Sequence, residues 1–368
     1  MKKLFFSLLI TILLQLNVFA QSGWNLIYNF EQGITNIAFK DSLTGLASGA
    51  VNAKIYRTVD GGISWRVVNI TGLSDVISNI IFYNDNICFG VGKNGTVIKS
   101  VDNGNTWSVG SVGDRSELRT IYATPGGTLF ICQRSGNDIY KSSDQGGSWT
   151  KIFSNSTGYV YDFGFINEKI GYLVGDSMVK TTDGGDNWFM INDIIPLARN
   201  LRIKFVTENI GYRLAGNYSG GKVVKTTDGG NNWFILYDSN YGPNIVDFTI
   251  SGTNTIWAVG YHNILNSRNA GSSWAHQSFT PLADLYKTTS INSLTCFVLN
   301  SSGGLYKTVD GGLSRPSLVS PNNNSIDLPL TTALSWSSFT SGNPFKLQIA
   351  ADAVLGNLVL DTMIFWNN

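Results

Sequence analysis

The sequence has little charge, few prolines, two histidines and three cysteines. Of its 368 residues, 14% are charged and 43% are hydrophobic, and the formal net charge is +1. So high an apolar fraction excludes a disordered chain, and so little charge is atypical of coiled coils and long helical arrays. The charge is balanced and no basic tract is present, which argues against nucleic acid as a partner.

The scarcity of cysteine and histidine limits the chemistry. Cys88, Cys132 and Cys296 each lie in an apolar stretch, so we expect buried free thiols rather than disulfides or nucleophiles. His262 and His276 are the only histidines, and no Cys/His spacing typical of a metal site occurs. The sequence therefore predicts no metal and no cofactor.

A long hydrophobic run occurs only at the start of the chain. A positively charged beginning precedes an apolar run over residues 4–14, and Val18 and Ala20 supply the small side chains that precede a cleavage site. The run is short of the roughly 20 residues that a membrane span needs, so an uncleaved anchor is the weaker interpretation. We expect residues 1–20 to be a signal peptide cleaved after Ala20. The protein would then be secreted or at the cell surface of a Gram-negative bacterium, with the periplasm as an alternative.

What the sequence does contain is glycine and aromatic residues. There are 40 glycines, and 12% of the residues are Phe, Trp or Tyr. Aromatic residues favour strands, and glycine favours the tight turns between them. After Trp65, four short β-prone runs at residues 66–68, 79–82, 86–91 and 96–100 are separated by polar breaks. We therefore predict an all-β fold.

One eight-residue motif recurs seven times, with Ser or Thr at position 1, Asp at position 3, Gly at position 5 and Trp at position 8. Its acidic and aromatic positions are Asp60 and Trp65, Asp102 and Trp107, Asp144 and Trp149, Asp183 and Trp188, Asp228 and Trp233, Asn269 and Trp274, and finally Asp310, with Arg315 in place of Trp. Successive tryptophans are 39 to 45 residues apart. This period is the size of a propeller blade of four short strands.

Each motif residue has a physical role in a tight turn. The Asp carboxylate can accept hydrogen bonds from the backbone N–H groups just ahead of it, and the Ser or Thr hydroxyl can tie the incoming strand. Glycine supplies the positive φ of the reversal. The Trp opens the next strand and buries its ring, which contributes roughly 2–3 kcal/mol when it is fully covered. We therefore expect the motif residues to be structural.

At these residues the sequence resembles the Asp-box repeat of bacterial neuraminidases, Ser/Thr-x-Asp-x-Gly-x-x-Trp. The fuller unit adds Ile-x-Phe, Gly-Tyr-x-Val-Gly and Val-x-Lys-Thr-Thr-Asp-Gly-Gly, and over residues 23–315 it is similar to photosystem II stability/assembly factors and their secreted bacterial relatives. The resemblance implies one seven-bladed β-propeller. It does not transfer a photosynthetic role, because likeness of fold is weak evidence for function.

The strand count predicts how the ring closes. The seventh repeat stops at its motif, whereas the mature chain opens with Gly23-Trp24-Asn25-Leu26-Ile27, which matches the end of a motif and a fourth strand. We expect residues 24–28 to pair with the strand at Gly304–Thr308 and to complete the seventh blade of a propeller over residues 21–315. Such closure removes two exposed sheet edges.

The composition changes after the last motif. Residues 316–368 resemble the start of a fibronectin type III module, with Trp336 as its buried ring. A sandwich of this kind needs about 100 residues. We therefore expect an incomplete module in this part of the chain.

Binding residues are expected on one face of the propeller, which we call the loop face, where the links from the fourth strand to the next first strand and from the second strand to the third meet. A polar ring around the channel is predicted at Asn36, Asn79, Thr120, Asp162, Arg202 and Asp247. Nearby loops add Tyr28, Phe30, Arg115, Arg119, Tyr159, Tyr161, Arg199, Tyr218, Tyr241, Tyr261 and His262. Arginine and aromatic residues suit protein interfaces and sugar stacking alike.

The candidate ligand-binding residues are Asn36, Asn79, Arg119, Tyr161, Asp162, Arg202, Asp247 and Tyr261. Alternatively, the ring only solvates the channel and the tyrosines cap blade edges.

Two functions compete at this stage. Asp-box propellers include sialidases and xyloglucan-type glycosidases, but the Arg-Ile-Pro start motif of sialidases is missing. Other glycosidases need two carboxyls roughly 5 to 9.5 Å apart, and the motif aspartates are committed to turns. We therefore predict an exported, monomeric, non-catalytic propeller that binds or scaffolds a protein or a glycan. The alternative is a glycoside hydrolase that acts on extracellular polysaccharide.

Overall fold

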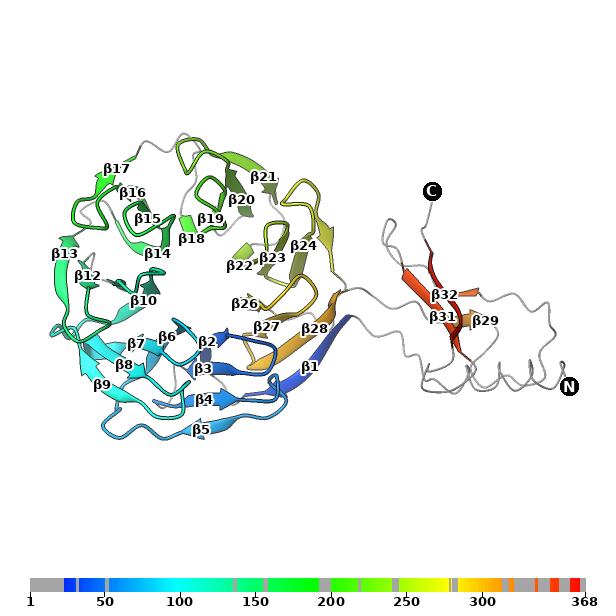
Figure 1. The fold of residues 1–368 in the computed structure, drawn as a ribbon, viewed down its shortest axis with the longest axis horizontal. Coiled ribbons are helices and arrows are strands. Elements are labelled where there is room, and N and C mark those ends of the chain that lie inside the picture. Colours follow the sequence, from blue (N-terminus) through cyan, green and yellow to red (C-terminus); the bar gives the residue numbers. More distant parts are fainter. Residues whose placement is uncertain are drawn as a thin grey trace, which may run out of the picture. The chain divides into compact units, whose positions relative to one another are not determined.

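A computed structural model describes residues 23–30, 33–49, 53–134, 138–154, 158–191, 200–217, 220–239, 245–277, 279, 284–312, 318–320, 335–336, 345–350 and 358–364. In these ranges the secondary structure is β, apart from one 3-10 turn, η1 (Lys93–Gly95) (Figure 1). Residues 26–311 form one compact unit, and the described residues on either side of them belong to a second unit. A search of the described residues found no helix long and apolar enough to span a membrane.

Seven four-stranded antiparallel sheets stand around a central channel as the blades of a propeller (Figure 1). Blade 1 contains β2 (Ile34–Phe39), β3 (Gly45–Gly49), β4 (Ile55–Thr58) and β5 (Arg66–Val68). Blade 2 contains β6 (Ile77–Phe82), β7 (Cys88–Gly92), β8 (Thr96–Ser100) and β9 (Ser108–Ser111), and blade 3 contains β10 (Leu118–Ala123), β11 (Leu129–Gln133), β12 (Asp138–Ser142) and β13 (Thr150–Ser154). In each blade the first strand lies innermost.

The remaining blades repeat this order. Blade 4 contains β14 (Val160–Phe165), β15 (Gly171–Gly175), β16 (Met178–Thr181) and β17 (Phe189–Met190). Blade 5 contains β18 (Asn200–Phe205), β19 (Gly211–Asn217), β20 (Gly220–Thr226) and β21 (Phe234–Asp238), and blade 6 contains β22 (Ile245–Ser251), β23 (Thr255–Gly260), β24 (Asn263–Ser267) and β25 (Ala275–His276). Blade 7 contains β26 (Leu285–Ser290), β27 (Cys296–Asn300), β28 (Gly304–Gly312) and β1 (Gly23–Asn29).

The apolar pattern of each repeat accounts for the way the blades pack. Second strands such as β3, β7 and β27 are buried along their whole length, because both of their faces contact neighbouring blades. Outer strands such as β9 and β17 are exposed. The core therefore consists of apolar layers between adjacent blades, such as the cluster around Phe89, Leu118 and Ile131.

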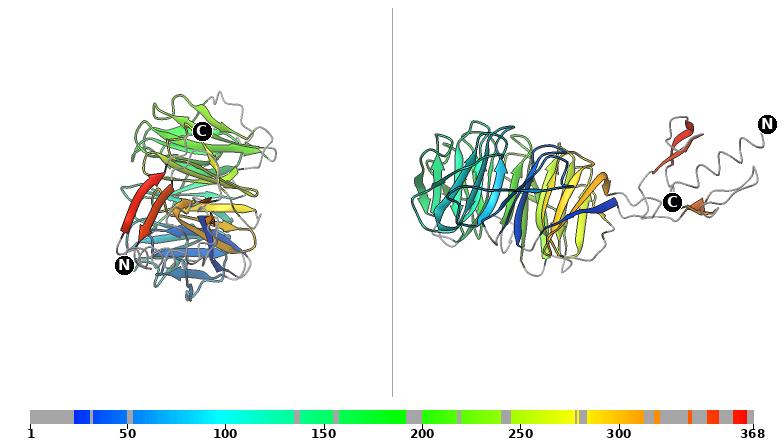
Figure 2. Two further views of the ribbon diagram at one scale, coloured as in Figure 1. Left: turned by 90° about the vertical axis from the view of Figure 1, so that its right-hand side faces the viewer. Right: turned by 90° about the horizontal axis from the view of Figure 1, so that it is seen from below.

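The N-terminal strand closes the ring, which confirms the strand-count prediction. In the sheet of blade 7, β1 lies beside β28 (Figures 1 and 2). The Phe30 N–H donates to the Gly303 carbonyl at 2.9 Å, and Phe30 is buried. Trp24 is buried as well. Blade 7 is thus assembled from the two ends of the repeat region, and β1 covers the edge of β28 that would otherwise be open.

The antiparallel order separates two faces of the propeller. The turns between first and second strands and the motif turns between third and fourth strands lie on one face, which we call the Asp-box face. On this face the N–H of Gly61 donates to the Leu43 carbonyl at 2.8 Å, and the N–H of Gly229 donates to the Asn209 carbonyl at 2.9 Å. The loop face carries the other two sets of links.

Four further strands follow the propeller. β29 (Leu318–Ser320) pairs with β30 (Ser335–Trp336), and β31 (Phe345–Ala350) pairs with β32 (Leu358–Ile364). The rest of the predicted fibronectin-like module lies outside the described residues, so that assignment stays a prediction. The predicted signal peptide also lies outside them.

Candidate functional site

The predicted polar ring lies at one repeated irregularity of the inner strands. Each first strand changes register in its first three residues, as between Ile34 and Asn36 in β2 and between Ile245 and Asp247 in β22. A β-bulge of this kind re-aims the next side chain. The ring residues Asn36, Asn79, Thr120, Asp162, Arg202 and Asp247 all occupy this position, and Lys287 of β26 is the seventh member, which the sequence analysis missed.

Three ring residues join neighbouring blades. The Asn79 Oδ1 accepts a hydrogen bond from the Ile121 N–H at 3.5 Å. The Asp162 Oδ2 accepts one from the Ile203 N–H at 3.1 Å, and the Asp247 Oδ2 accepts one from the Thr288 N–H at 2.9 Å. Part of the predicted ligand site is therefore structural, because these acceptors hold backbone donors of the next inner strand.

The charged members of the ring form one network in blades 5 to 7. Arg202 Nε donates to Asp247 Oδ1 at 2.8 Å, and Lys287 Nζ lies 3.5 Å from Asp247 Oδ2. Burial acts to raise the pKa of Asp247, but Lys287 and Arg202 outweigh burial and lower that pKa below its usual value. Asp247 is thus a buried anion that is held by two cations and one backbone N–H.

Two further charges line the same channel. Burial raises the pKa of Asp162, although the Arg202 charge opposes this shift. Lys204 lies on β18 two residues beyond Arg202 and is exposed. Desolvation beside the channel lowers the pKa of Lys204, although the Asp247 carboxylate opposes this shift, and the Lys287 charge reinforces it. The network therefore carries more cationic than anionic groups.

A stacked pair lies beside the network on the loop face. The guanidinium carbon of Arg119 lies 4.1 Å from the ring centroid of Tyr161, a cation–π geometry. Both residues directly precede a ring position, Arg119 in β10 and Tyr161 in β14. At the same place in β26, Tyr286 donates its hydroxyl to the Ile34 carbonyl of blade 1. Arg119 is half-buried, so it retains a solvent-facing edge.

The other predicted loop residues divide into three groups. Tyr159 and Tyr261 are exposed on the loop face, and His262 Nε2 lies 3.5 Å from Asp284 Oδ1. Phe30 is instead a core residue, since its ring lies 5.0 Å from the Trp65 ring, and Tyr28 packs against Phe30 at 4.8 Å. Arg115 is also exposed, in the link between β9 and β10 on the loop face, and the last three residues, Arg199, Tyr218 and Tyr241, lie outside the described residues.

The motif carboxylates hold their own turns. In blade 1, Thr58 Oγ1 donates to Asp60 at 2.7 Å and accepts the Gly62 N–H at 3.0 Å. The Ser64 N–H donates to the same carboxylate at 3.0 Å, and Trp65 Nε1 donates to the Gly62 carbonyl at 3.0 Å. Equivalent bonds surround the motif residues of blades 2 to 6: Asp102, Asp144, Asp183, Asp228 and Asn269.

The electrostatics agree with this use of the carboxylates. The Asn187 N–H and amide lower the pKa of Asp183 to about 2, and the Asn232 N–H and amide do the same for Asp228.

The motif glycines have φ values from 75° to 90° in blades 1 to 6, a region that L side chains disfavour. At Gly185, a Cβ would also lie only 2.6 Å from the Phe130 ring.

A second set of contacts, which the sequence analysis missed, links each motif turn to the preceding blade. The residue before the motif Ser or Thr is lysine or arginine in six blades, and its side-chain nitrogen donates a hydrogen bond to the motif turn of the following blade. The contacts are Arg57 Nε to Asn103 O (2.8 Å), Lys99 Nζ to Gln145 O (2.9 Å), Lys141 Nζ to Asp186 Oδ1 (2.7 Å), Lys180 Nζ to Asn231 Oδ1 (3.4 Å), Lys225 Nζ to Ala270 O (3.4 Å) and Lys307 Nζ to Gly61 O (3.2 Å). In blade 6, Arg268 Nη2 reaches the Gly311 carbonyl at 3.1 Å. The Lys307 contact links blade 7 to blade 1, so this series of contacts continues across the point where the ring closes.

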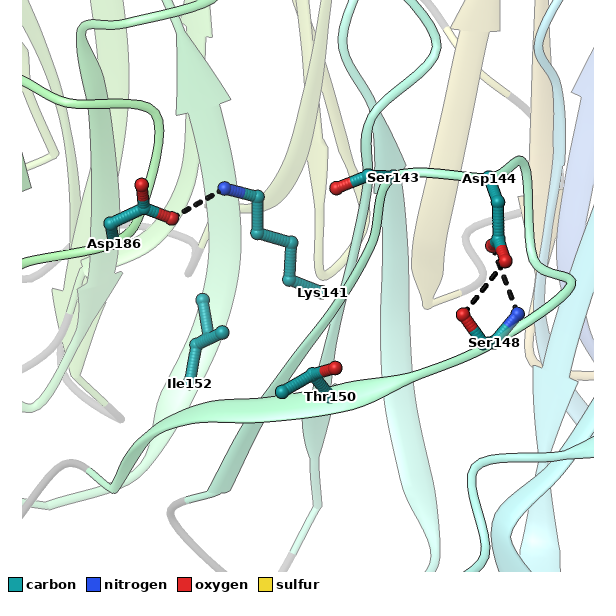
Figure 3. A pocket seen from close by; sticks show the side chains of 7 residues that line it. All are labelled: Lys141, Ser143, Asp144, Ser148, Thr150, Ile152 and Asp186. Atoms are coloured by element: carbon teal, nitrogen blue, oxygen red, sulfur yellow. Dashed lines mark hydrogen bonds and ion pairs between the residues drawn. The ribbon is translucent and has the colours of Figure 1, made fainter.

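One open hollow on the propeller is lined mainly by polar side chains. It has a volume of about 400 Å³ and lies between the outer corners of blades 3 and 4, lined by Lys141, Asp144, Ser148 and Asp186 (Figure 3). Its lysine and carboxylates already take part in the two structural contacts above. We therefore place the candidate site at the channel mouth rather than in this hollow.

Buried thiols and metal ligands add no further site. Cys88, Cys132 and Cys296 are buried and free, as predicted, and burial raises the pKa of each thiol to about 12. A thiol in such surroundings is a poor nucleophile. Among the described residues, no group of three or more His, Cys, Asp or Glu side chains could hold a metal ion.

Comparison with known proteins identifies relatives of the propeller. The sequence model of the family described as "Photosynthesis system II assembly factor YCF48" matches residues 16–161. The "Uncharacterized protein YkuO" of Bacillus subtilis (strain 168) is 41% identical over 61 residues, which cover 17% of this chain and 20% of that protein. The chain thus spans about a fifth of the length of this curated relative.

Solved structures share the architecture. "YCF48 bound to D1 peptide" has a TM-score of 0.63 at 20% identity, with 78% of this chain and 97% of that chain covered. The GH74 xyloglucanase from Xanthomonas campestris has a TM-score of 0.62 at 13% identity, with 82% of this chain and 58% of that chain covered. At such identities the likeness shows the fold alone.

Proposed function

We propose that this chain, an Asp-box β-propeller that resembles the photosystem II assembly factor YCF48 family, is a non-catalytic binding module that holds a polypeptide at its loop face. The observation that carries the proposal is the cationic part of the channel mouth, where Arg119, Arg202, Lys204 and Lys287 outnumber the carboxylates Asp162 and Asp247. An acidic segment or a C-terminal carboxylate complements such a surface.

The stacked pair gives this surface a shape as well as a charge. Tyr161 supports the Arg119 guanidinium from one side at 4.1 Å, so the donors of Arg119 are held in one plane. The exposed rings of Tyr159 and Tyr261 add apolar contact area on the same face. A structure with the same fold is described as YCF48 bound to a D1 peptide. Arginine and aromatic side chains suit either ligand, and the peptide-bound structure of the same fold favours a polypeptide over a glycan.

Catalysis is disfavoured by the state of the two ring carboxylates. Asp162 accepts a backbone N–H, and Asp247 accepts a backbone N–H and contacts two cations. A general acid or base has to reach the bond that it cleaves. The similarity to a GH74 xyloglucanase keeps glycoside hydrolysis as the second candidate. Activity on xyloglucan, sialyl or uronic-acid substrates would establish it, and inactivity on all three would count against it.

Binding of a defined peptide tests the proposal. The probe is a fluorescein-labelled peptide rich in Asp and Glu with a free C-terminal carboxylate, and its binding is followed by anisotropy. We expect R119Q combined with K204Q to weaken binding at least tenfold, because the two substitutions remove the half-buried Arg119 charge and the exposed Lys204 charge without breaking the Arg202–Asp247 pair. The matched control is K151Q, an exposed lysine on the outer strand β13. Equal affinity of the double variant and the control would overturn the proposal.

We further propose that residues 1–20 direct export, on the sequence grounds given above. N-terminal sequencing of the protein recovered from a secreting host should begin at Gln21. Recovery of membrane-associated protein that still begins at Met1 would contradict this proposal.

A further inference from the structure

The junctions between neighbouring inner strands differ in what accepts one backbone N–H. At three junctions, a ring side chain of one blade accepts the N–H of the residue that follows the ring position in the next blade. These pairs are Asn79 with Ile121, Asp162 with Ile203, and Asp247 with Thr288. Between blades 5 and 6 the ring residue is instead Arg202, and a guanidinium donates hydrogen bonds but accepts none. The N–H at this junction belongs to Phe248, and no side chain of the described residues accepts it.

The Phe248 N–H lies on the channel wall between β18 and β22, which are neighbours around the channel (Figure 1). Phe248 has the same register in β22 as Ile203 has in β18, one residue beyond the ring position, so the two N–H groups point the same way in their blades. Phe248 is buried. Because buried backbone donors are nearly always paired, this N–H is a candidate contact for a ligand that brings an acceptor.

Arg202 reaches toward the same junction and keeps spare donors. Its Nε donates to Asp247 Oδ1 at 2.8 Å, and its Nη1 donates to the Leu201 carbonyl at 2.9 Å. Its Nη2 makes no hydrogen bond with any part of the chain that the structure describes. One edge of the guanidinium is therefore available to an acceptor.

Lys204 adds an ammonium to the same wall. It lies two residues beyond Arg202, so the two side chains share one face of β18 about 7 Å apart along the strand. Lys204 is exposed, and within the described residues its Nζ has no hydrogen-bond acceptor and no ion-pair partner. The equivalent residues of the other six blades are neutral: Ala38, Ile81, Tyr122, Gly164, Thr249 and Thr289.

The charge of this wall favours an anion. Both nearby carboxylates are already paired, since Asp247 contacts Arg202 and Lys287, and Asp162 accepts the Ile203 N–H. Desolvation beside the channel lowers the pKa of Lys204. A bound anion would offset the loss of water around this ammonium. Lys287 has a similar position between blades 7 and 1, but the residue two positions beyond it is the neutral Thr289.

We propose that the channel wall between blades 5 and 6 binds a free tetrahedral oxyanion, phosphate or sulfate, through Lys204, the Nη2 of Arg202 and the Phe248 N–H. These donors come from two blades and from two levels of the channel. A tetrahedral ion presents oxygens in several directions and can accept from all three, whereas the two oxygens of a carboxylate lie in one plane.

This site goes beyond the polypeptide site proposed above, because it takes a different ligand at a deeper level of the channel. The two sites share Arg202 and Lys204, so we expect phosphate to compete with the acidic peptide. Only this competition rests on the proposed function, and the binding of phosphate does not.

Isothermal titration calorimetry with sodium phosphate and sodium sulfate tests the site. Acetate and chloride at equal ionic strength are the comparison ions. K204Q removes the unpaired ammonium, and K151Q on the outer strand β13 is its matched control. R119Q is a second control, because it removes a cation that stacks on Tyr161 rather than one at the junction of blades 5 and 6. Circular dichroism and thermal melts verify that each variant folds.

The wild type should bind phosphate or sulfate at least tenfold more tightly than acetate and chloride. K204Q should weaken this binding at least tenfold, whereas K151Q and R119Q should change it less than threefold. Absence of binding, equal affinity for acetate, or equal losses in K204Q and R119Q would overturn the proposal. Peptide anisotropy separates the two proposals: peptide binding without phosphate binding would overturn the oxyanion site alone, and phosphate binding without peptide binding would overturn the proposed function alone.

Discussion

Each blade has two polar positions, one at its outer corner and one beside the channel, and they differ in how strictly they repeat. At the corner, the same group of atoms recurs, with a carboxylate that accepts the N–H four residues ahead of it in blades 1 to 5. Beside the channel, the equivalent residue is Asn, Thr, Asp, Arg or Lys. A bond within one turn demands Asp or the similarly shaped Asn, whereas the position beside the channel accepts several residue types. The divergent ring is therefore where function can be built.

The largest predicted loss of stability comes from removing β1, the strand that completes the seventh blade. Deletion of residues 21–29 removes β1 and its buried Trp24, and it exposes the edge of β28. Loss of one buried Trp alone costs about 3–5 kcal/mol, so we expect the melting temperature to fall by more than about 10 °C. A synthetic peptide of residues 21–30 should restore part of the stability when it is added in trans. An unchanged melting curve would show that β1 does not close the ring.

The next largest loss of stability is expected in the ring, where a charged residue, Asp247, is compared with a neutral one, Asn79. D247A leaves the half-buried Arg202 and Lys287 without their shared carboxylate and the Thr288 N–H without its acceptor. Removing one partner from a buried pair costs about 3 kcal/mol. N79A loses one hydrogen bond to the Ile121 N–H, so it should cost about 1 kcal/mol. Urea unfolding measures both, and equal losses would mean that the charge network adds nothing to the backbone contact.

A smaller effect is expected at the corners. D228A removes the acceptor of the Asn232 N–H and of the Thr226 hydroxyl, which should cost about 1–2 kcal/mol, as loss of a capping side chain does in a helix. D228N should cost less, because Asn269 makes the corresponding bonds in blade 6, where its Oδ1 accepts the Ser273 N–H at 2.8 Å. If D228N melts at the same temperature as D228A, an amide cannot replace the carboxylate in this turn, and the prediction is wrong.

The corner and the ring also differ in how well the sequence predicts them. The corner is local: Thr58, Asp60 and Gly62 lie within five residues, so the sequence alone contains the whole turn. Six ring positions could be aligned because their first strands share a local sequence pattern. The alignment missed Lys287 because Leu285-Tyr286-Lys287 is followed by two threonines instead of the apolar residues that end most first strands.

Contacts between blades are invisible in the sequence for a physical reason. The lysine or arginine before six of the seven motifs is plain in the sequence, but its partner lies in the next blade and is most often a backbone carbonyl, which every residue has. The use of Asn79, Asp162 and Asp247 as acceptors for the next inner strand is hidden in the same way. The six predicted residues share one register position in their strands, but the sequence could not separate the structural members of the ring from its accessible cations.

Acidification provides the last test of the comparison between corner and ring. The pKa values of the corner carboxylates Asp60, Asp183 and Asp228 are all lowered, whereas in the ring the pKa of Asp162 is raised and that of Asp247 is lowered. Hydrogen bonds from the next residues of the turn lower the pKa of Asp183 and Asp228 to about 2, and those from Ser64 outweigh burial and lower that of Asp60 to about 2. The unfolded value is near 3.9, so these groups stabilise the fold fully above pH 4, and their contribution is lost as the pH falls through 2. The urea midpoint should therefore fall steeply between pH 4 and pH 2. D228N should show a shallower fall over this window, since Asn does not titrate, and a fall of equal size would place the acid sensitivity elsewhere.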